Sequence, residues 1–281
     1  GVSIAALMPV DAPQAEWDAY QVIFATSEGD VRRNALSDFA NVMRNGKIAM
    51  KLPEGVELIG ARMATENDDV MLVTASGRAI RFQTTDVRVF KGRDSTGVRG
   101  IRLAGDNRVV SMSVIRHFEA EPSERAAYLK MRRAVEGALD DGAEADEDEE
   151  AVAEAAITQE RYAEMSAAED RILTITAKGA GKTSSSFDYP LRGRGGQGVM
   201  AMDKAMRGGE LVASFPVEAD DQIMLATSTG QSIRVPVDGI SFRSRSAGGV
   251  RVFNTAPGET VVSVARIADQ GEDEAEDGTE S

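Results

Sequence analysis

The sequence predicts an all-β fold, a propeller-like disc of four-stranded blades in a partial ring of about four blades, with an inserted α-helical hairpin. Three observations predict it: a repeat of about fifty residues, strand-like runs within each repeat, and one segment that breaks the period. Each repeat is marked by a hydrophobic run that ends in threonine, any two residues and glycine, with the threonines at Thr26, Thr74, Thr176 and Thr227. Because a repeat is one structural unit copied, the stacking of the units determines the fold.

Each unit has the composition of short strands joined by tight turns. Runs rich in Val, Ile, Met and Thr alternate with Gly, Asn, Asp and Ser, which is typical of strands and hairpins. The Thr-x-x-Gly segments lie where a hairpin must reverse, because glycine accepts a positive φ without steric cost. Blades around an axis cover one another's faces and leave only short edges exposed, which favours a disc over an open sheet.

Two further anchors divide the chain into units. A second glycine follows each first glycine by 17 to 20 residues, at Gly46, Gly97, Gly198 and Gly249. A strand-like segment also frames the units, with copies VSIAAL (2–7), LIGARM (58–63), VSMSVI (110–115), VASFPV (212–217) and VSVARI (262–267). We therefore expect a disc domain over 1–268, with units at about 1–56, 57–108, 109–210 and 211–267.

The period is broken at 118–170, where glycine is lost and alanine, glutamate and arginine increase. Pro122 and Ser123 begin a run in which apolar side chains recur at helical spacing, and a weaker alanine-rich pattern covers about 151–168. The segment between these patterns is strongly acidic. We expect a helical acidic insertion that grows from the third blade.

The net charge of −14 is concentrated in two segments. Residues 140–154 contain nine acidic side chains and 269–281 contain seven, and neither segment contains Lys or Arg. Without these sixteen, the 46 acidic residues fall to 30 against 32 basic ones, so the body of the protein is slightly basic. We interpret 269–281 as a disordered acidic tail and the acidic run of the insertion as solvated. The alternative is that these segments compete with a polyanion for the basic surface.

Composition excludes several classes of protein. The chain contains no cysteine, which excludes disulfides and thiolate metal sites, and no apolar stretch approaches the roughly 20 residues of a membrane helix. We expect a cytoplasmic protein with no membrane partner. The chain starts at Gly1 inside a repeat strand, which we interpret as a fragment of something longer.

Two segments resemble chemical sites and are better explained without chemistry. KGAGKT (178–183) resembles a phosphate-binding loop, but Thr176 stands where the first glycine is required and the following residues are not helical, so a hairpin turn that carries a lysine is favoured. His117 is the only histidine, and we expect a surface or junction residue. We identify no catalytic residue and no metal site in the sequence.

Basic residues recur in register between the units. Arg33, Arg81 and Arg234 each stand four residues after a first glycine, and Lys182 lies beside the equivalent Thr183. Equivalent positions face the same way in successive blades, so we expect a basic band that suits the phosphates of duplex DNA, since aromatic residues for stacking on single strands are few. The alternative is that these cations pair with acids of the repeats. The candidates for contact with DNA are Arg33, Arg44, Lys47, Arg81, Arg93, Arg99, Lys182, Arg194, Arg234, Arg245 and Arg251.

The repeats resemble a known family, the C-terminal domain of the A subunit of DNA gyrase and of its topoisomerase IV counterpart, within the type IIA topoisomerases. DDVMLVTASGRAIRF (68–82), STGVRGIRL (95–103) and DQIMLATSTGQSIRV (221–235) carry the resemblance, which covers the four units and leaves the insertion and tail outside. It implies a β-pinwheel, a disc whose blades exchange strands with their neighbours. The implied function is to bend duplex DNA around the rim and present it for strand passage and negative supercoiling.

The resemblance also implies partners and an incomplete ring. The partners would be double-stranded DNA and, in an A2B2 assembly, the gyrase B chain with the rest of the gyrase A chain, in a cytoplasmic enzyme associated with the nucleoid. This segment would need no cofactor, because ATP and Mg²⁺ would bind elsewhere, and it would not be an enzyme by itself. The heptapeptide Gln-Arg-Arg-Gly-Gly-Lys-Gly that marks the family's first blade has no intact copy, and RGRGGQG (192–198) is its nearest, degenerate match. Two alternatives stay open: the topoisomerase IV domain and a propeller that binds proteins.

Overall fold

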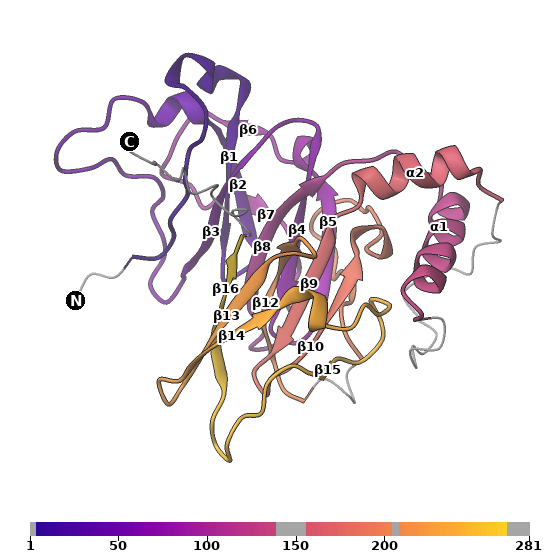
Figure 1. Cartoon of the computed structure of the whole chain (residues 1–281). Coiled ribbons are helices and arrows are strands. Elements are labelled where there is room, and N and C mark those ends of the chain that lie inside the picture. Colours follow the sequence, from indigo (N-terminus) through magenta and orange to yellow (C-terminus); the bar gives the residue numbers. More distant parts are fainter. Residues whose placement is uncertain (1–3, 139–155, 204–207, 269–281) are drawn as a thin grey trace, which may run out of the picture.

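The computed structural model describes residues 4–138, 156–203 and 208–268. Their strands form sheets that stand side by side, and two helices lie at one side (Figure 1). The acidic run predicted at 140–154 and the tail predicted at 269–281 fall outside the described residues.

Four sheets are built in the same order, from an inner strand to an outer one. In the order that the sheets take along the chain, sheet I contains β3 (Leu58–Ala64), β1 (Gln21–Thr26), β2 (Asp30–Ala35), β6 (Val89–Phe90) and β7 (Val98–Arg99). Sheet II contains β8 (Val109–Arg116), β4 (Asp68–Thr74), β5 (Arg78–Gln83) and β11 (Val199–Met200). Sheet III contains β12 (Leu211–Val217), β9 (Arg171–Thr176), β10 (Ala180–Ser185) and β15 (Val250–Arg251). Sheet IV contains β16 (Val261–Ile267), β13 (Gln222–Thr227) and β14 (Ser232–Pro236).

Short helical elements complete the fold. The two α-helices of the insertion are α1 (Pro122–Val135) and α2 (Gln159–Ala168), and α1 begins at the proline that the sequence indicates. Single 3-10 turns precede β1 or follow the second strand of each hairpin: η1 (Gln14–Ala19), η2 (Leu36–Phe39), η3 (Thr84–Asp86), η4 (Ser186–Asp188) and η5 (Val237–Gly239).

The sheets exchange strands, as the resemblance to a β-pinwheel implies. The short strands β7, β11 and β15 each follow a second glycine and pair with the hairpin of the preceding unit. Gly97 has φ 102°, and a Cβ there would lie 2.0 Å from the carbonyl oxygen of Val31, so only glycine allows the strand to approach this closely. A Cβ on Gly198 would lie 2.3 Å from the carbonyl oxygen of Ala79. The second glycine is therefore the point where one unit joins the sheet of another.

The framing strands also belong to the preceding sheet. LIGARM lies in β3, which pairs with β1 and not with the hairpin that follows it in the chain. Each sheet is thus a hairpin of one sequence unit completed by strands of the next, and sheets and units are offset. Residues 4–7, the described part of the expected first copy, form no strand.

The Thr-x-x-Gly segments are the hairpin turns that the sequence predicts. In each, the glycine N–H donates to the carbonyl of the threonine at 3.0 Å, and the glycine φ lies between 80° and 90°. The threonine hydroxyl then accepts the N–H of the residue four positions on, at 3.0 to 3.2 Å. This second bond explains why threonine recurs: its side chain accepts a partly buried backbone N–H at the start of the next strand.

The core consists of apolar layers between successive sheets. Ile23 and Val31 of sheet I pack with Leu72 and Phe82 of sheet II, and similar layers separate sheets II and III and sheets III and IV. The inner strands β3, β8, β12 and β16 pack on one another in that order. The opposite ends of the sheets form the rim, which consists of the outer strands and the three loops that lead to them, 87–99, 189–200 and 240–251.

Candidate nucleic-acid interface

The rim loops carry a cluster of exposed basic residues where sheets I and II meet. The loop at 192–196 lies beside β7, because Gly195 donates its N–H to Gly100 at 2.6 Å and Arg102 donates its N–H to Gly196 at 2.8 Å. Residues from two units, about 95 positions apart, are thereby brought together. We call this the rim cluster; its members, all exposed, are Arg88, Arg99, Arg102, Arg192 and Arg194.

Two of the sequence-predicted residues hold the rim cluster together. Arg194 donates from Nε to the carbonyl of Asp86 at 2.9 Å and from Nη1 to the carbonyl of Arg99 at 3.1 Å. Arg99 donates to the carbonyl of Glu28 at 2.6 Å and lies 3.4 Å from the Asp30 carboxylate. Each guanidinium is fixed by backbone carbonyls on one side and open to solvent on the other. Such fixed, half-solvated cations suit repeated phosphate contacts.

Sequence reasoning missed three members of the cluster, Arg88, Arg102 and Arg192, although Arg192 stands in register with Lys91 and Arg243, six residues before a second glycine. Their signal is position in a rim loop: each lies within the segment between a 3-10 turn and the end of an outer strand or just beyond it. Arg88 lies over the ring of Phe90, with its guanidinium carbon 3.7 Å from the ring centroid, which holds it flat on the surface.

Four of the eleven predicted residues are buried, so the expectation that every register position faces solvent is wrong for Arg33, Arg81, Lys182 and Arg245, which are at most 5% exposed. Lys182 is fully buried, and its Nζ donates to the carbonyls of Ser244 at 2.9 Å, Ala247 at 2.6 Å and Arg245. These three carbonyls belong to the rim loop that arrives from the next unit. The lysine therefore clamps this loop onto sheet III.

The other buried cations also bond backbone carbonyls of neighbouring segments, in different arrangements. Arg81 donates to the carbonyl of Ser186 at 2.8 Å and to the buried carboxylate of Asp69 at 2.8 Å. Arg33 donates to the carbonyl of Thr84 at 3.1 Å. Arg245 donates to the carbonyls of Asp188, at 2.6 Å, and Met200. Arg33 and Arg81 thus satisfy carbonyls of the 3-10 turn of the next hairpin, and Arg245 holds the rim loop that contains it to Asp188 and Met200.

Arg32, outside the predicted set, shows that the clamp recurs. It occupies in sheet I the position of Lys182 in sheet III, and its Nη1 donates to the carbonyls of Arg93 at 2.9 Å and Ser95 at 2.6 Å. These carbonyls stand four and two residues before Gly97, as those of Arg245 and Ala247 stand before Gly249. Burial and the neighbouring Arg93 lower the pKa of Arg32 from its ordinary value. Arg32 and Lys182 thus stabilise the exchange of strands between units, and their donors are occupied by backbone carbonyls.

The remaining predicted residues lie at the surface in separate places. Arg44 and Lys47 are exposed on the long loop before β3, where Lys47 donates to the carbonyls of Asp38 at 2.7 Å and Ala40 at 3.1 Å. Arg93 is partly exposed and donates to the carbonyl of Ile48 at 2.9 Å. The hydrogen bonds of Lys47 and Arg93 therefore lead to the loop before β3 rather than to the rim cluster.

Arg234 and Arg251 are exposed on β14 and β15. Arg234 occupies the register position of the buried Arg33 and Arg81. It differs because β14 has no outer strand within the described residues, so no loop covers it.

KGAGKT is the hairpin between β9 and β10, with Gly179 in the turn and Lys182 in the clamp, so the interpretation as a turn with a lysine is confirmed. Within the described ranges, no group of three His, Asp or Glu side chains is arranged to hold a metal ion. None of the described helices is long and apolar enough to cross a membrane.

His117 joins the insertion to sheet II. Its Nδ1 lies 2.8 Å from Oδ1 of Asp69, and its Nε2 lies 3.0 Å from Oε1 of Glu119. Burial acts to lower the pKa of His117, but the hydrogen bonds to Glu119 and Asp69 outweigh it, and the pKa is raised. Because Asp69 also binds Arg81, one buried carboxylate connects the clamp of sheet II to the first residue of the insertion.

Comparisons with known proteins agree with this architecture. A family described as the DNA gyrase C-terminal domain, a beta-propeller, matches residues 20–65, 68–116, 170–217 and 221–268. The DNA gyrase A subunit of Granulibacter bethesdensis is 46% identical over 272 residues, which cover 93% of this chain and 29% of that protein. The corresponding protein of Rickettsia bellii is 39% identical, covering 96% and 30%. The chain therefore spans under a third of the length of these curated relatives.

Two solved structures share the fold. A DNA gyrase A C-terminal domain superposes with a TM-score of 0.63 and 19% identity, covering 89% of this chain and 67% of that one. The C-terminal domain of a DNA topoisomerase IV superposes with a TM-score of 0.64 and 17% identity, covering 89% and 62%. The two agree about equally well, so the fold alone does not distinguish gyrase from topoisomerase IV.

Proposed function

Because this chain belongs to the family of DNA gyrase A C-terminal domains, we propose that it binds duplex DNA along its rim and bends it. The observation that carries the proposal is the rim cluster, five exposed arginines gathered from two units. Arg99 and Arg194 of this cluster are held by backbone carbonyls. Fixed cations lose little conformational freedom when they bind phosphate, and their positions on a curved edge impose curvature on the DNA.

The buried clamps support the same proposal. Bending a duplex of 20–30 bp by 40–90° costs of order 1–6 kcal/mol by elastic estimates, and the protein must resist this force without deforming. Lys182 and Arg32 tie the rim loops to the sheets through charge-assisted hydrogen bonds, and Arg81 binds the 3-10 turn before one of these loops. The rim is thus a rigid surface around which the DNA bends.

In the whole protein we propose that the wrapped segment is presented to the strand-passage gate, so that ATP-dependent strand passage introduces negative supercoils. The partners are then duplex DNA and the gyrase B chain with the rest of the gyrase A chain, in an A2B2 assembly in the cytoplasm, associated with the nucleoid. This segment supplies binding and geometry and carries no catalytic residue or cofactor of its own, since ATP and Mg²⁺ act elsewhere in the assembly.

The test replaces three cations of the rim cluster, Arg88, Arg102 and Arg192, by glutamine. Affinity for duplex DNA is measured between low and moderate salt, and bending is measured on permuted duplexes. We expect weaker binding for all sequences and a slope of log affinity against log salt that is smaller by about 3, one for each phosphate that is no longer neutralised.

The control is Arg62→Gln, which removes one exposed charge from the inner strand β3. It should change the slope little, because an inner strand does not face the rim. Affinity that is insensitive to salt would instead favour a propeller that binds proteins, and an unchanged slope in the triple variant would contradict the assignment of the rim cluster.

A further inference from the structure

The insertion grows out of a turn that the other sheets close in the same way. Six residues before each marking threonine stand Asp68, Asp170 and Asp221 in the last three units. Each accepts a backbone N–H from the end of the preceding inner strand or the residue after it: Thr65 at 2.7 Å, Arg116 at 2.8 Å and Glu218 at 2.7 Å, respectively. In two sheets, donor and acceptor are three residues apart. In the third, they are separated by 117–169, the segment that the family match also omits.

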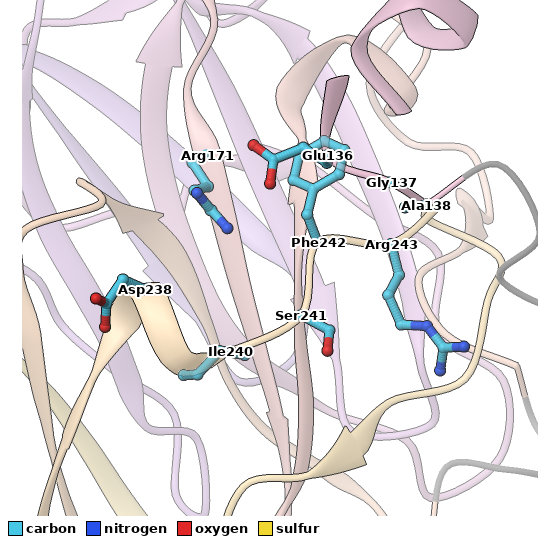
Figure 2. Close-up of a pocket in the computed structure, with 9 residues that line it drawn as sticks. All are labelled: Glu136, Gly137, Ala138, Arg171, Asp238, Ile240, Ser241, Phe242 and Arg243. Atoms are coloured by element: carbon cyan, nitrogen blue, oxygen red, sulfur yellow. The ribbon is translucent and has the colours of Figure 1, made fainter. Parts of the chain in front are cut away.

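Helix α1 crosses the rim from the loop after β10 to the rim loop of sheet III. Near its start, Arg125 donates to the carbonyl of Phe187 at 3.4 Å, and near its end Arg133 donates to the hydroxyl of Ser244 at 3.2 Å. Arg132 lies over the ring of Phe242 at 4.7 Å. Figure 2 shows the end of the helix, Glu136 to Ala138, beside residues 238–243, around a pocket of about 300 Å³.

The covered loop is equivalent to one that is open elsewhere. Phe242 stands seven residues before Gly249, as Phe90 stands seven before Gly97. At Phe90 the ring is covered by Arg88, an exposed cation of the rim cluster. At Phe242 the nearer cation, Arg132, comes from the insertion, and Arg171 of β9 lies 5.6 Å from the ring centroid. Both rings are 6% exposed, but two residues further on Gly92 is exposed, whereas the equivalent Ser244 is buried and bonded by Arg133 of the insertion.

Arginines of the insertion are paired with acidic side chains, so they do not make the covered part of the rim basic. Arg132 is paired with Glu136 at 2.5 Å and Glu169 at 2.8 Å. Arg161 is paired with Glu124 at 2.9 Å. Residues 117–169 contain 16 acidic side chains against five basic ones. The insertion as a whole is thus acidic and repels phosphate.

The docking is built into sheet III. Phe187, 2% exposed, packs with Tyr128 of α1 and Met165 of α2. The residues in register with it, Thr85 and Asp238, are exposed. An apolar side chain at this single position shows that sheet III is adapted to hold the helices in place.

From these contacts we infer that the insertion limits where DNA binds. Helices α1 and α2 cover the rim of sheet III and keep duplex DNA from residues 240–244. The DNA therefore contacts the rim cluster beside them. The inference rests on the proposed function, because it assigns the DNA to one part of the rim. It goes beyond it by giving the insertion a task, which is to set where the contact with DNA stops.

The test uses photo-crosslinking from single cysteines, which the cysteine-free chain allows without further changes. Val89→Cys places the probe on the open rim loop, and Ser241→Cys places it at the equivalent position eight residues before the second glycine, in the pocket beside Glu136–Ala138 that follow α1. Both positions are exposed to small reagents. In the otherwise unchanged chain, we expect a crosslink to a duplex from Val89→Cys and none above the DNA-free background from Ser241→Cys.

An excision variant supplies the second arm. Residues 117–169 are replaced by Glu-Asn, copied from Glu66 and Asn67, and Phe187, which packs against both helices, is changed to Thr so that its apolar side chain is not uncovered. Ser241→Cys should now crosslink. Equal crosslinking from both cysteines in the full chain, or no crosslink from Ser241→Cys in an excised protein that still binds DNA, overturns the inference.

The failures are distinguishable. If neither cysteine crosslinks and no binding is seen at low salt, the proposed function fails. If the excised protein does not fold, the comparison of the two cysteines in the full chain still decides the inference.

Discussion

Replacement of Lys182 by methionine tests whether the buried cations hold the rim. The ammonium group is fully buried and donates to three carbonyls of the rim loop. Because the site is buried, water does not replace these hydrogen bonds when the ammonium group is removed. Methionine keeps the length and apolar stem of the side chain and removes only the donors. The change therefore leaves three buried acceptors without this partner.

The magnitude follows from these hydrogen bonds. Each buried acceptor that loses its donor costs about 1–3 kcal/mol, which sums to between about 3 and about 9 kcal/mol. Removing the buried charge recovers several kcal/mol of desolvation. We expect the free energy of unfolding to fall by about 3 kcal/mol, with the loss concentrated in the loop that the lysine clamps.

The assay combines urea unfolding with hydrogen exchange. Amides of Arg245 and Ala247, which bond Asp188 at 2.7 Å and Ser244 at 3.1 Å, should exchange much faster in the variant. Lys178→Met, on the exposed turn of the same hairpin, is the matched control and should change stability by no more than about 0.5 kcal/mol. If Lys182→Met were no more destabilised than this control, or if the loop kept its protection, the clamp would be refuted.

Further predictions concern the strand exchange and the base of the insertion. Gly97→Ala should destabilise the protein by more than about 3 kcal/mol, because its Cβ would lie 2.0 Å from a backbone oxygen of β2. Gly105→Ala, with φ 57° and open space around it, should cost only about 1 kcal/mol, and equal losses in denaturant unfolding would contradict the packing argument. The pKa of His117 is raised because its hydrogen bonds to Glu119 and Asp69 outweigh burial, so its stabilisation is fully present below its ordinary pKa of 6.5 and is lost as the pH rises through the raised value. The difference in unfolding free energy between the natural chain and His117→Asn should therefore shrink as the pH rises above the ordinary pKa of about 6.5, and a difference that is constant with pH would exclude this role.

The sequence was sufficient for the fold class because its signals are local. The Thr-x-x-Gly turn needs a hydroxyl acceptor and a positive φ within five residues, and both are visible in the sequence. The start of α1 at Pro122 is equally local. The exchange of strands is not, because β7 joins β2 across about 65 residues and no short pattern records that pairing. Only the resemblance to the family indicated it.

The same long-range exchange explains the errors at the site. Register identifies equivalent positions, but it does not show what covers them. Arg81 is buried because a loop from more than one hundred residues later lies over it, whereas Arg234, in the same register, is exposed at the last described sheet. Conversely, Arg102 joins the rim cluster through the hydrogen bond that its N–H donates to Gly196 of another unit, a long-range contact that no spacing within a unit records.

The offset between sheets and units constrains how such an array changes its number of blades during evolution. A duplication or loss of one period alters two sheets at once, because each unit lends an outer strand to its predecessor. Two sheets that become neighbours in this way are compatible only if the incoming rim loop places carbonyls next to the buried cation of the receiving sheet, as residues 244–247 do for Lys182. We therefore expect the rim loop that donates carbonyls and the sheet that carries the buried cation to be inherited together. A recombination that separates them would leave a buried lysine or arginine without hydrogen-bond acceptors, which would destabilise the product.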